Sequence, residues 1–417
     1  MSIYYVSNNG NDLNDGLTPE TAWQTIKKVN ETIVGADEVR FHCGETFYGQ
    51  LKAPHGISET QQTTYTFYGE GEKPVVSQYK ITKPGKWEKH EEGVYKFDLT
   101  NTDNFTGNVI DINSNVGFMK FGGKIYPEKK FLYEEMQNQW DFYCDDQYVY
   151  VKSDKCPCEY SQEIKLACSI YCMRFVPFVR VVGINFTGTG AHGIQGVTEG
   201  SYIADCEFHE IGGSRLLEDV YLSNGKLNRV RHGNGVETWA NSANVTVERC
   251  KFSDIYDVAT SIQGWKVVRN WENIIFRDNV IWNCAQAFEI WTGGGEIPNL
   301  GIVNCRFENN VCINSGYGWG GQARPDKDQS CHLLIYHLDS DLCDITITGN
   351  VFSNAKNSIL FKSFGVENLP EDYKIYGNTI IRKPGQPIAF RCGPESEYDK
   401  AFEEKICRDN RVFDTIE

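Results

Sequence analysis

A short unit recurs along the chain from about residue 179 to residue 390. Each unit has a run rich in β-branched and aromatic residues, then an anchor residue, then a second apolar run. The anchors are spaced by 44, 29, 31, 40 and 28 residues and are Cys206, Cys250, Asn279, Asn310, Asn350 and Asn378. Repeats of about 20 to 50 residues are typical of solenoids. Because the runs alternate as strands do and show no helical periodicity, they predict an all-β chain folded as a parallel β-helix.

The anchor positions suit a corner that repeats on every coil. Strands of successive coils pair about 4.8 Å apart, so equivalent side chains stack in ladders along the axis. Asn tolerates the left-handed backbone of a tight turn and hydrogen-bonds within turns, while a buried Cys behaves as a small hydrophobe. We therefore expect the anchors to be structural.

Composition narrows the class of protein. The net charge of −15 argues against nucleic acid and anionic membranes as partners. No apolar run approaches the ~20 residues that cross a bilayer. The first twenty residues carry no secretory signal pattern, and the fifteen cysteines are odd in number and often fall within strands. We predict a cytoplasmic protein, or an exported form whose signal has been removed; the sequence leaves the oligomeric state open.

The N-terminal segment predicts a cap for the solenoid. A strand near Tyr4 to Val6 leads into a loop rich in Gly, Asn and Asp, and an amphipathic helix is expected to start near Thr18-Pro19. Such a helix would cover the open end of the core. We divide the chain into residues 1–74 for the cap and first coils, 75–165 for an inserted module, and 166–417 for the main β-helix.

The opening residues also carry a family resemblance. The segment from Tyr5-Val-Ser-Asn-Asn-Gly-Asn-Asp to Gly16-Leu-Thr-Pro-Glu-Thr-Ala-Trp-Gln-Thr-Ile resembles the start of right-handed β-helix enzymes of the pectate-lyase-like superfamily. With the coils it covers over half of the chain. The resemblance implies a right-handed parallel β-helix with a first strand and a capping helix. Glycosidases, polysaccharide lyases, epimerases and phage tailspikes share this architecture, so activity is not implied by the fold.

Residues 75 to 165 interrupt the repeat. The segments 87–99, 108–112, 122–125 and 140–152 alternate apolar and polar residues between turn signals, which predicts antiparallel strands. This module resembles the insertion of β-helix glycosidases that forms one wall of the active-site cleft. A purely structural appendage is an equally open interpretation.

Tryptophan and carboxylate residues gather in one stretch of the repeat. Six of the nine tryptophans lie between Trp239 and Trp319, together with Glu237, Asp257 and Glu289. Indole rings stack on sugars, and paired carboxylates cleave glycosidic bonds. The sequence therefore predicts a saccharide site, with an oligosaccharide or glycoside as substrate.

Strand alternation predicts which side chains leave the core. With Val236, Phe288 and Ile290 facing inward, Glu237 and Trp239 on one coil and Glu289 and Trp291 on another should face outward. The coil between them, with Val258 and Ile262 inward, should present Asp257, Ser261, Gln263 and Trp265. A lone exposed carboxylate is usually only a solvated charge, but three of them among tryptophans favour a site.

The distance between neighbouring coils, each of which is one rung of the ladder, then predicts the mechanism of bond cleavage. Carboxylates on neighbouring coils would lie about 5 to 6 Å apart, near the separation in retaining glycosidases, whereas Glu237 and Glu289 would be nearer the inverting range. We expect Asp257 as nucleophile and Glu289 as acid/base, with Glu237 binding a hydroxyl or sharing the acid role. The segments around Asp257 and Glu289 also resemble the carboxylate pairs of β-helix exo-glycosidases.

Other residues on these coils complete the predicted site. Glycines and aromatics from Gly316 onward suggest a rim, and Arg324 could bind hydroxyls or a carboxylate. Taken singly, each of these residues is more readily explained by a structural role. The predicted substrate-binding set is His232, Trp239, Gln263, Trp265, Trp291, Trp319, Arg324, His337 and Lys362.

No metal or cofactor is expected. Cys156, Cys158, Cys168 and Cys172 could ligate zinc, but their spacing departs from paired CxxC motifs and the last two fall in an apolar, strand-like segment. No Asp-rich calcium cluster is evident, which weakens the alternative of a polysaccharide lyase. A second alternative is a non-catalytic carbohydrate-binding or tailspike-like β-helix. The favoured hypothesis is a retaining glycoside hydrolase acting on oligosaccharide ends.

Overall fold

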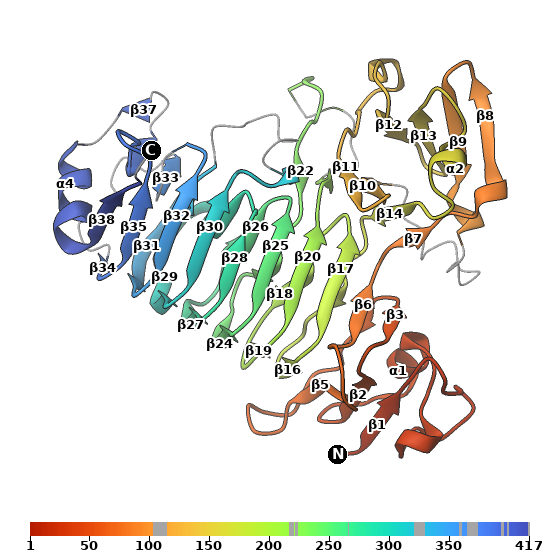
Figure 1. Cartoon of the computed structure of the whole chain (residues 1–417). Coiled ribbons are helices and arrows are strands. Elements are labelled where there is room, and N and C mark those ends of the chain that lie inside the picture. The colour runs from red at the N-terminus through yellow and green to blue at the C-terminus, as the bar shows by residue number, and fades with distance from the viewer. Residues whose placement is uncertain are drawn as a thin grey trace.

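The structure is a computed structural model that describes residues 1–102, 115–216, 221, 224–265, 267–320, 330–357, 361–364, 374–392, 396–397 and 400–415. Within these ranges the side chains of 294–298, 336–342, 361–364, 389–392, 396–397 and 400–402 are not described. The chain winds into successive coils along one axis, with the N-terminal coils at one end and the C-terminal helix at the other (Figure 1).

Three ladders of parallel strands form the faces of the solenoid. The first face contains β1 (Ile3–Val6), β2 (Glu38–His42), β5 (Thr63–Tyr68), β16 (Val179–Val182), β19 (Tyr202–Ala204), β24 (Ala243–Glu248), β27 (Trp271–Arg277), β29 (Gln286–Glu308), β31 (Leu333–Thr348) and β34 (Lys374–Tyr376). The second face contains β4 (Leu51–Lys52), β15 (Met173–Arg174), β18 (Ile194–Val197), β23 (Val236–Thr238), β26 (Val258–Trp265), further parts of β29 and β31, β33 (Phe361–Phe364) and β36 (Ala389–Cys392).

The third face is the one toward the viewer in Figure 1. It contains β3 (Thr46–Tyr48), β6 (Val75–Ser77), β17 (Asn185–Thr189), β20 (Glu207–Ile211), β25 (Lys251–Ile255), β28 (Val280–Trp282), β30 (Val311–Ser315), β32 (Val351–Ala355), β35 (Thr379–Arg382) and β38 (Arg411–Asp414). This register confirms the predicted parallel β-helix.

Aromatic stacking along the axis fills the core. The rings of Phe186, Phe208 and Phe252 stack on successive coils with centroid separations of 5.2 and 4.9 Å. Each of these side chains is fully buried. Because strand pairing holds equivalent residues one rung apart, a single apolar position per coil produces a continuous core column.

The anchor residues form a buried ladder, as the spacing predicts. Asn310 donates from its side-chain amide to Asn350 Oδ1 over 3.0 Å and accepts from the Asn279 backbone N–H over 3.0 Å. The ladder begins at Cys250, whose backbone N–H donates to Asn279 Oδ1. It continues beyond Asn350, whose side-chain amide donates to Asn378, and Asn378 donates in turn to Asn410. Each amide thus satisfies buried backbone groups that would otherwise lack partners.

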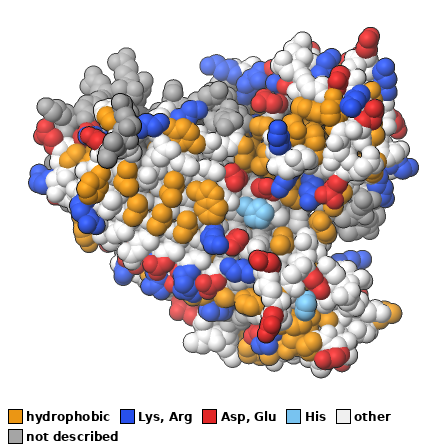
Figure 2. All heavy atoms as spheres, in the orientation of Figure 1, with side chains coloured by type: hydrophobic (Ala, Val, Ile, Leu, Met, Phe, Trp, Pro, Cys, Tyr) orange, Lys and Arg blue, Asp and Glu red, His pale blue; other side chains and the backbone are white. Residues whose placement is uncertain are grey.

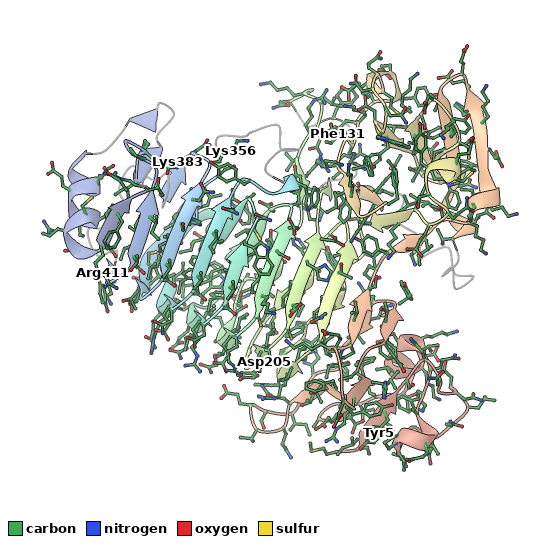
Figure 3. The ribbon with its side chains drawn as sticks, viewed as in Figure 1. Tyr5, Phe131, Asp205, Lys356, Lys383 and Arg411 are labelled. Atoms are coloured by element: carbon green, nitrogen blue, oxygen red, sulfur yellow. The ribbon has the colours of Figure 1, made fainter. Side chains whose placement is uncertain are left out.

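The left-handed backbone lies one position before the anchors, which corrects the expectation that the anchors themselves adopt it. Positive φ angles occur at Asp205, Arg249, Asp278 and Asn309, each directly before an anchor. Figure 3 shows Asp205 at the edge of the coils, where the chain turns from one face to the next. The anchor side chain is therefore free to point inward while its neighbour makes the turn.

The N-terminal cap forms from two short helices instead of one. Thr18-Pro19 begins only a 3-10 turn at Pro19–Thr21, and the α-helix α1 (Ile26–Thr32) starts later, with the Thr25 hydroxyl accepting from the Lys28 N–H over 3.1 Å. Ile26 and Val29 are buried in the main core cluster. The helix therefore closes the end of the core, as predicted, with a different start.

The inserted module consists of two four-stranded antiparallel sheets. One contains β7 (Lys80–Ile81), β10 (Val116–Phe121), β11 (Lys124–Tyr126) and β14 (Lys165–Cys168), and the other contains β8 (Trp87–Glu91), β9 (Val94–Asp98), β12 (Phe142–Cys144) and β13 (Tyr148–Lys152). Short helices occur at Pro84–Lys86, Leu99–Asn101, Tyr133–Glu135 and Pro157–Tyr160. The predicted strand at 108–112 lies outside the described residues.

The module is inserted between two coils of the β-helix. β5 before it pairs with β16 after it, and β4 pairs with β15, so the solenoid continues across the insertion. Strand β6 (Val75–Ser77) belongs to the third face of the β-helix and not to the module. The antiparallel strands of the module therefore begin at Lys80 and end at Cys168, slightly later than the predicted limits of 75 and 165. The module has its own core, in which Phe142 is fully buried. Figure 3 labels Phe131, another residue of the module.

The outer surface of the third face is apolar toward the C-terminal end. Hydrophobic side chains gather in rows over β28, β30, β32 and β35 (Figure 2). The outward side chains there include Val280, Trp282, Val311 and Ile313, and these four strands contain no Asp or Glu. The described chain closes with β37 (Ser396–Glu397) and helix α4 (Lys400–Asp409) before β38. Among the described helices, none is long and apolar enough to span a membrane.

Candidate active site

Two glutamates share one side-chain ladder on the second face. Strand pairing places Glu237 of β23 opposite Ser261 of β26, and Ser261 opposite Glu289 of β29. The two glutamates are therefore two rungs apart, about 10 Å between their backbones. The residue between them contributes only a short hydroxymethyl side chain. The predicted inward positions Phe288 and Ile290 are buried, which confirms the alternation around Glu289.

Glu237 differs from the solvent-facing carboxylate that alternation predicts. Its side chain leaves the core but is covered, with only 3% of the residue exposed. Burial raises the pKa of the Glu237 carboxyl to about 8, against a weaker lowering by the Gly196 backbone. Oε2 is buried, and no described residue forms a hydrogen bond with it. The raised pKa favours the carboxylic acid form of this group at neutral pH.

His192 lies beside Glu237, and a second histidine and a tyrosine lie against the His192 ring. The Nε2 of His192 lies 3.4 Å from Glu237 Oε1, and the His192 Nδ1 accepts a 2.8 Å hydrogen bond from the Asn234 N–H. The His192 ring stacks on Tyr171 at 5.7 Å and lies 5.0 Å from the ring of His232. Burial lowers the pKa of His192 far below its usual range and that of His232 to about 4, so both imidazoles are neutral at pH 7.

Glu289 is half-buried and is held by a neighbouring amide. The Gln263 Nε2 donates to Glu289 Oε2 over 2.7 Å across one rung. The donor requires an acceptor oxygen at that position, which suits an ionised carboxylate. Glu237 and Glu289 thus occupy different environments in one ladder: Glu237 is buried and its raised pKa favours the acid, whereas Glu289 is hydrogen-bonded and only partly buried. Such a division of environments separates acid from base roles.

Three tryptophans line the same face beside the glutamates. The rings of Trp265 and Trp291 stack at 5.9 Å with an interplanar angle of 21°, and Trp239 lies 6.3 Å from Trp291. Trp239 is 37% exposed and Trp265 49% exposed. A side chain at Gly293 would lie only 2.9 Å from the Trp265 ring, so the glycine allows the close packing. The exposed indole faces can take a sugar ring.

The module is anchored next to His232. The hairpin of β21 (Ser214–Arg215) and β22 (Arg231–His232) carries the buried Arg231, whose guanidinium donates to the carbonyls of Gly213, Pro127 and Gly117. Gly117 and Pro127 belong to the module. The charge of Arg231 is thus used for docking, while the adjacent His232 faces His192.

Asp257 corrects the predicted pairing of carboxylates. It lies at the corner before β26, where its backbone carbonyl accepts from the Ala285 N–H over 3.0 Å. The residue opposite Glu289 is Ser261, four positions later, or about 13 Å of extended chain. Because the strand begins only at Val258, Asp257 and Glu289 do not stand side by side on adjacent rungs.

Trp319 is a second correction, because its ring is buried instead of offering a sugar platform. Only 8% of the residue is exposed, and the indole packs 4.8 Å from Phe118 of the module and 5.5 Å from Tyr256. Its Nε1–H donates to the Asp254 carbonyl over 2.7 Å. The ring therefore joins the module to the β-helix.

Three predicted binding residues cannot be placed. Arg324 lies outside the described residues, and the side chains of His337 and Lys362 are not described. The backbone register does place Lys362 opposite Leu334, which is itself opposite Glu289. Lys362 thus belongs to the ladder of the two glutamates.

The four cysteines weighed as zinc ligands do not share one environment. Cys168 is buried in the core of the module and Cys172 in the core of the β-helix, while Cys156 and Cys158 are partly exposed at helix α2 (Pro157–Tyr160). Within the part of the chain that the structure describes, no group of three or more His, Cys, Asp or Glu residues could hold a metal ion.

Sequence reasoning missed His192, whose Nε2 lies 3.4 Å from Glu237 Oε1. Its position between β17 and β18 is a corner without alternation, so no periodic signal singles it out. The register of Ile194 with Val236 does equate the His192-Gly-Ile segment with Asn234-Gly-Val one coil later. Aligning the coils on this glycine would have placed the imidazole one rung before Asn234.

Comparison with known proteins agrees with the fold. Residues 173–324 match a family described as a right handed beta helix region. A solved structure of XylC with xylose is similar with a TM-score of 0.54 at 12% identity, covering 91% of this chain and 68% of that chain. The protein is therefore a right-handed parallel β-helix.

Two further solved structures are more distant. A GH136 lacto-N-biosidase from Eubacterium ramulus has a TM-score of 0.49 at 12% identity, covering 99% of this chain and 68% of that chain. A rhamnogalacturonan lyase has a TM-score of 0.42 at 11% identity, covering 100% of this chain and 90% of that chain. A search of curated protein sequences finds no match to this chain. At these identities the similarity concerns the fold alone.

Proposed function

We propose that this β-helix is a carbohydrate-active enzyme, and more specifically a glycoside hydrolase that acts on oligosaccharide ends. The observation that carries the proposal is the ladder of Glu237, Ser261 and Glu289. It joins a buried carboxyl whose pKa is raised to about 8 with a hydrogen-bonded carboxyl two rungs away. Glycosidic cleavage needs this combination of one protonated and one ionised carboxyl group. Action at chain ends rests on the family resemblance of the sequence.

The roles follow from the two environments. Glu237 would donate its proton to the oxygen of the departing group, because Oε2 is unpartnered and the group is protonated at neutral pH. Glu289 would act as the base that activates water. The carboxyl groups of inverting enzymes lie about 6.5 to 9.5 Å apart, which two rungs can provide, whereas retaining enzymes need about 5 to 5.5 Å. We therefore propose inversion in place of the retention predicted with Asp257.

The tryptophans would hold the sugar rings next to this pair. Trp239, Trp265 and Trp291 lie on the same face, with two of the three rings stacked on each other. Apolar contact between indole and sugar ring fixes the position of the scissile bond, and hydroxyl groups can then be bound by Gln263 and His232.

A panel of chromogenic glycosides tests the proposal. The wild-type protein should release the chromophore from at least one glycoside, and the E237Q and E289Q variants should remain folded but lose that activity. A lyase would instead form an unsaturated sugar with near-ultraviolet absorbance from an acidic polysaccharide. A binding module would retain the glycoside, as seen by calorimetry, without turnover. Either of the last two results would overturn the hydrolase assignment.

A further inference from the structure

His192 occupies a position in which its two ring nitrogens have different partners. Nδ1 accepts from the Asn234 backbone N–H, and Nε2 faces Glu237 Oε1 at 3.4 Å. The ring is 7% exposed, which disfavours the charged form. A neutral imidazole carries one proton, and because Nδ1 is an acceptor, that proton is on Nε2. The backbone of Asn234 thereby sets the tautomer of His192.

This tautomer has a consequence for Glu237. Closing of the 3.4 Å contact between Nε2 and Oε1 would make Oε1 the acceptor oxygen of the carboxyl group and would place the acid proton on Oε2. Oε2 is buried and has no hydrogen-bond partner among the residues that the structure describes. A carboxylic acid with a fixed free O–H is the arrangement that a general acid requires. The 3.4 Å contact is long, as such contacts often are before a substrate is bound.

We propose that His192 is the positioning residue of Glu237, directing the acid proton to Oε2 through an Nε2–H donor whose tautomer the Asn234 backbone fixes. This inference rests on the proposed role of Glu237 as general acid. His192 touches the acid and not the reacting atoms, so its effect is on orientation and on the proton affinity of Glu237.

The charged and titratable groups around Glu237 are few among the described residues. Tyr171 precedes β15, His192 lies between β17 and β18, and His232 is on β22. Glu289 is two rungs along the second face. Of these, His192 alone has a nitrogen within 4 Å of the Glu237 carboxyl. Loss of its donor should raise the pKa of Glu237 further, because a donor stabilises the ionised carboxylate more than the acid.

Two substitutions separate this role from a structural one. H192N keeps an acceptor near the position of Nδ1 for the Asn234 N–H but removes the donor to Glu237. H192Q keeps a donor near the position of Nε2 but loses the acceptor. A positioning role predicts that H192N lowers kcat by about 10- to 100-fold with KM little changed, while H192Q stays within about threefold of the wild type. H209Q on the third face is the control and should match the wild type.

An infrared titration gives the same answer without a substrate. The carboxylic-acid band of Glu237, assigned by its loss in E237Q, should titrate near pH 8 in the wild type and in H192Q but at higher pH in H192N. The inference would be overturned if H192N had the same titration and the same activity as the wild type. It would also be overturned if H192Q were folded but lost as much activity as H192N. If the titration behaves as expected but no glycoside is cleaved, the proposed function fails and the positioning of Glu237 stands.

Discussion

Glu237 and Glu289 lie in one side-chain ladder of the β-helix, two rungs apart, with Ser261 between them. Their separation is set by strand pairing and does not depend on a flexible loop. The environments nevertheless differ, since Glu237 is 3% exposed and Glu289 is half-buried with an amide donor. A solenoid can thus place an acid and a base at a distance fixed by the number of coils between them.

Replacement of the ladder carboxylates should abolish turnover without unfolding the protein. E237Q and E289Q should each lower kcat by about 100- to 10,000-fold, the usual range for losing acid or base assistance. D257N should cost less, because Asp257 lies at the corner before β26. Steady-state kinetics on the best glycoside of the panel provide the measurement. A loss in D257N that equals the loss in E289Q would return Asp257 to the catalytic pair.

The burial of Glu237 should make stability depend on pH. Its pKa in the folded state is raised from 4.5 to about 8, so the folded protein binds a proton that the unfolded chain releases between these values. The wild type should therefore lose roughly 5 kcal/mol of stability relative to E237Q as pH rises from about 4.5 to 8. Urea denaturation at several pH values measures this. A constant difference between the two proteins would show that Glu237 is ionised in the fold.

The tryptophans should divide into binding and structural residues. Trp265→Ala should weaken binding of an oligosaccharide while changing stability by less than about 1 kcal/mol, because the ring is 49% exposed. Trp319→Ala should cost about 3 to 5 kcal/mol, because its ring packs between the module and the β-helix. Calorimetric titration and thermal unfolding of both variants distinguish the two. A large stability loss in Trp265→Ala would assign that ring to the core.

The asparagine ladder should be a main source of stability at its corner. Asn310→Ala removes hydrogen bonds to Asn279, Asn350 and the Phe276 carbonyl and leaves buried groups unpaired, at a cost of about 3 kcal/mol or more. Asn304→Ala, in an exposed ladder, is the matched control and should cost less than about 1 kcal/mol. Equal effects in chemical denaturation would contradict a special role of the buried ladder.

The sequence predicts the repeated parts of this molecule well, and the reason is physical. Asn279, Asn310 and Asn350 recur because each coil must satisfy the same buried backbone groups, so periodicity alone identifies the coil and its corner. Alternation likewise places Phe288 and Ile290 inward. These predictions depend only on neighbours along a strand or on equivalent positions in the next coil.

The parts that the sequence does not predict depend on contacts without a period. Asp257 lies at a corner before β26. The inward and outward alternation of strand residues such as Ile262 does not extend to that position. Trp319 is buried by Phe118, which is about two hundred residues away in the module and reaches it only in the folded chain. The contact of His192 with Glu237, and that of His232 with His192, arise in the same way, from a corner and a hairpin of other coils.

The most direct test of the central claim is the stereochemistry of the first sugar released. Proton NMR of the reaction in its first minutes, before mutarotation, reports the anomer formed from an active glycoside. A two-rung pair of Glu237 and Glu289, which leaves room for water, predicts that the product has the inverted anomeric configuration. Retention of configuration would contradict this pair and require a carboxylate closer to Glu289.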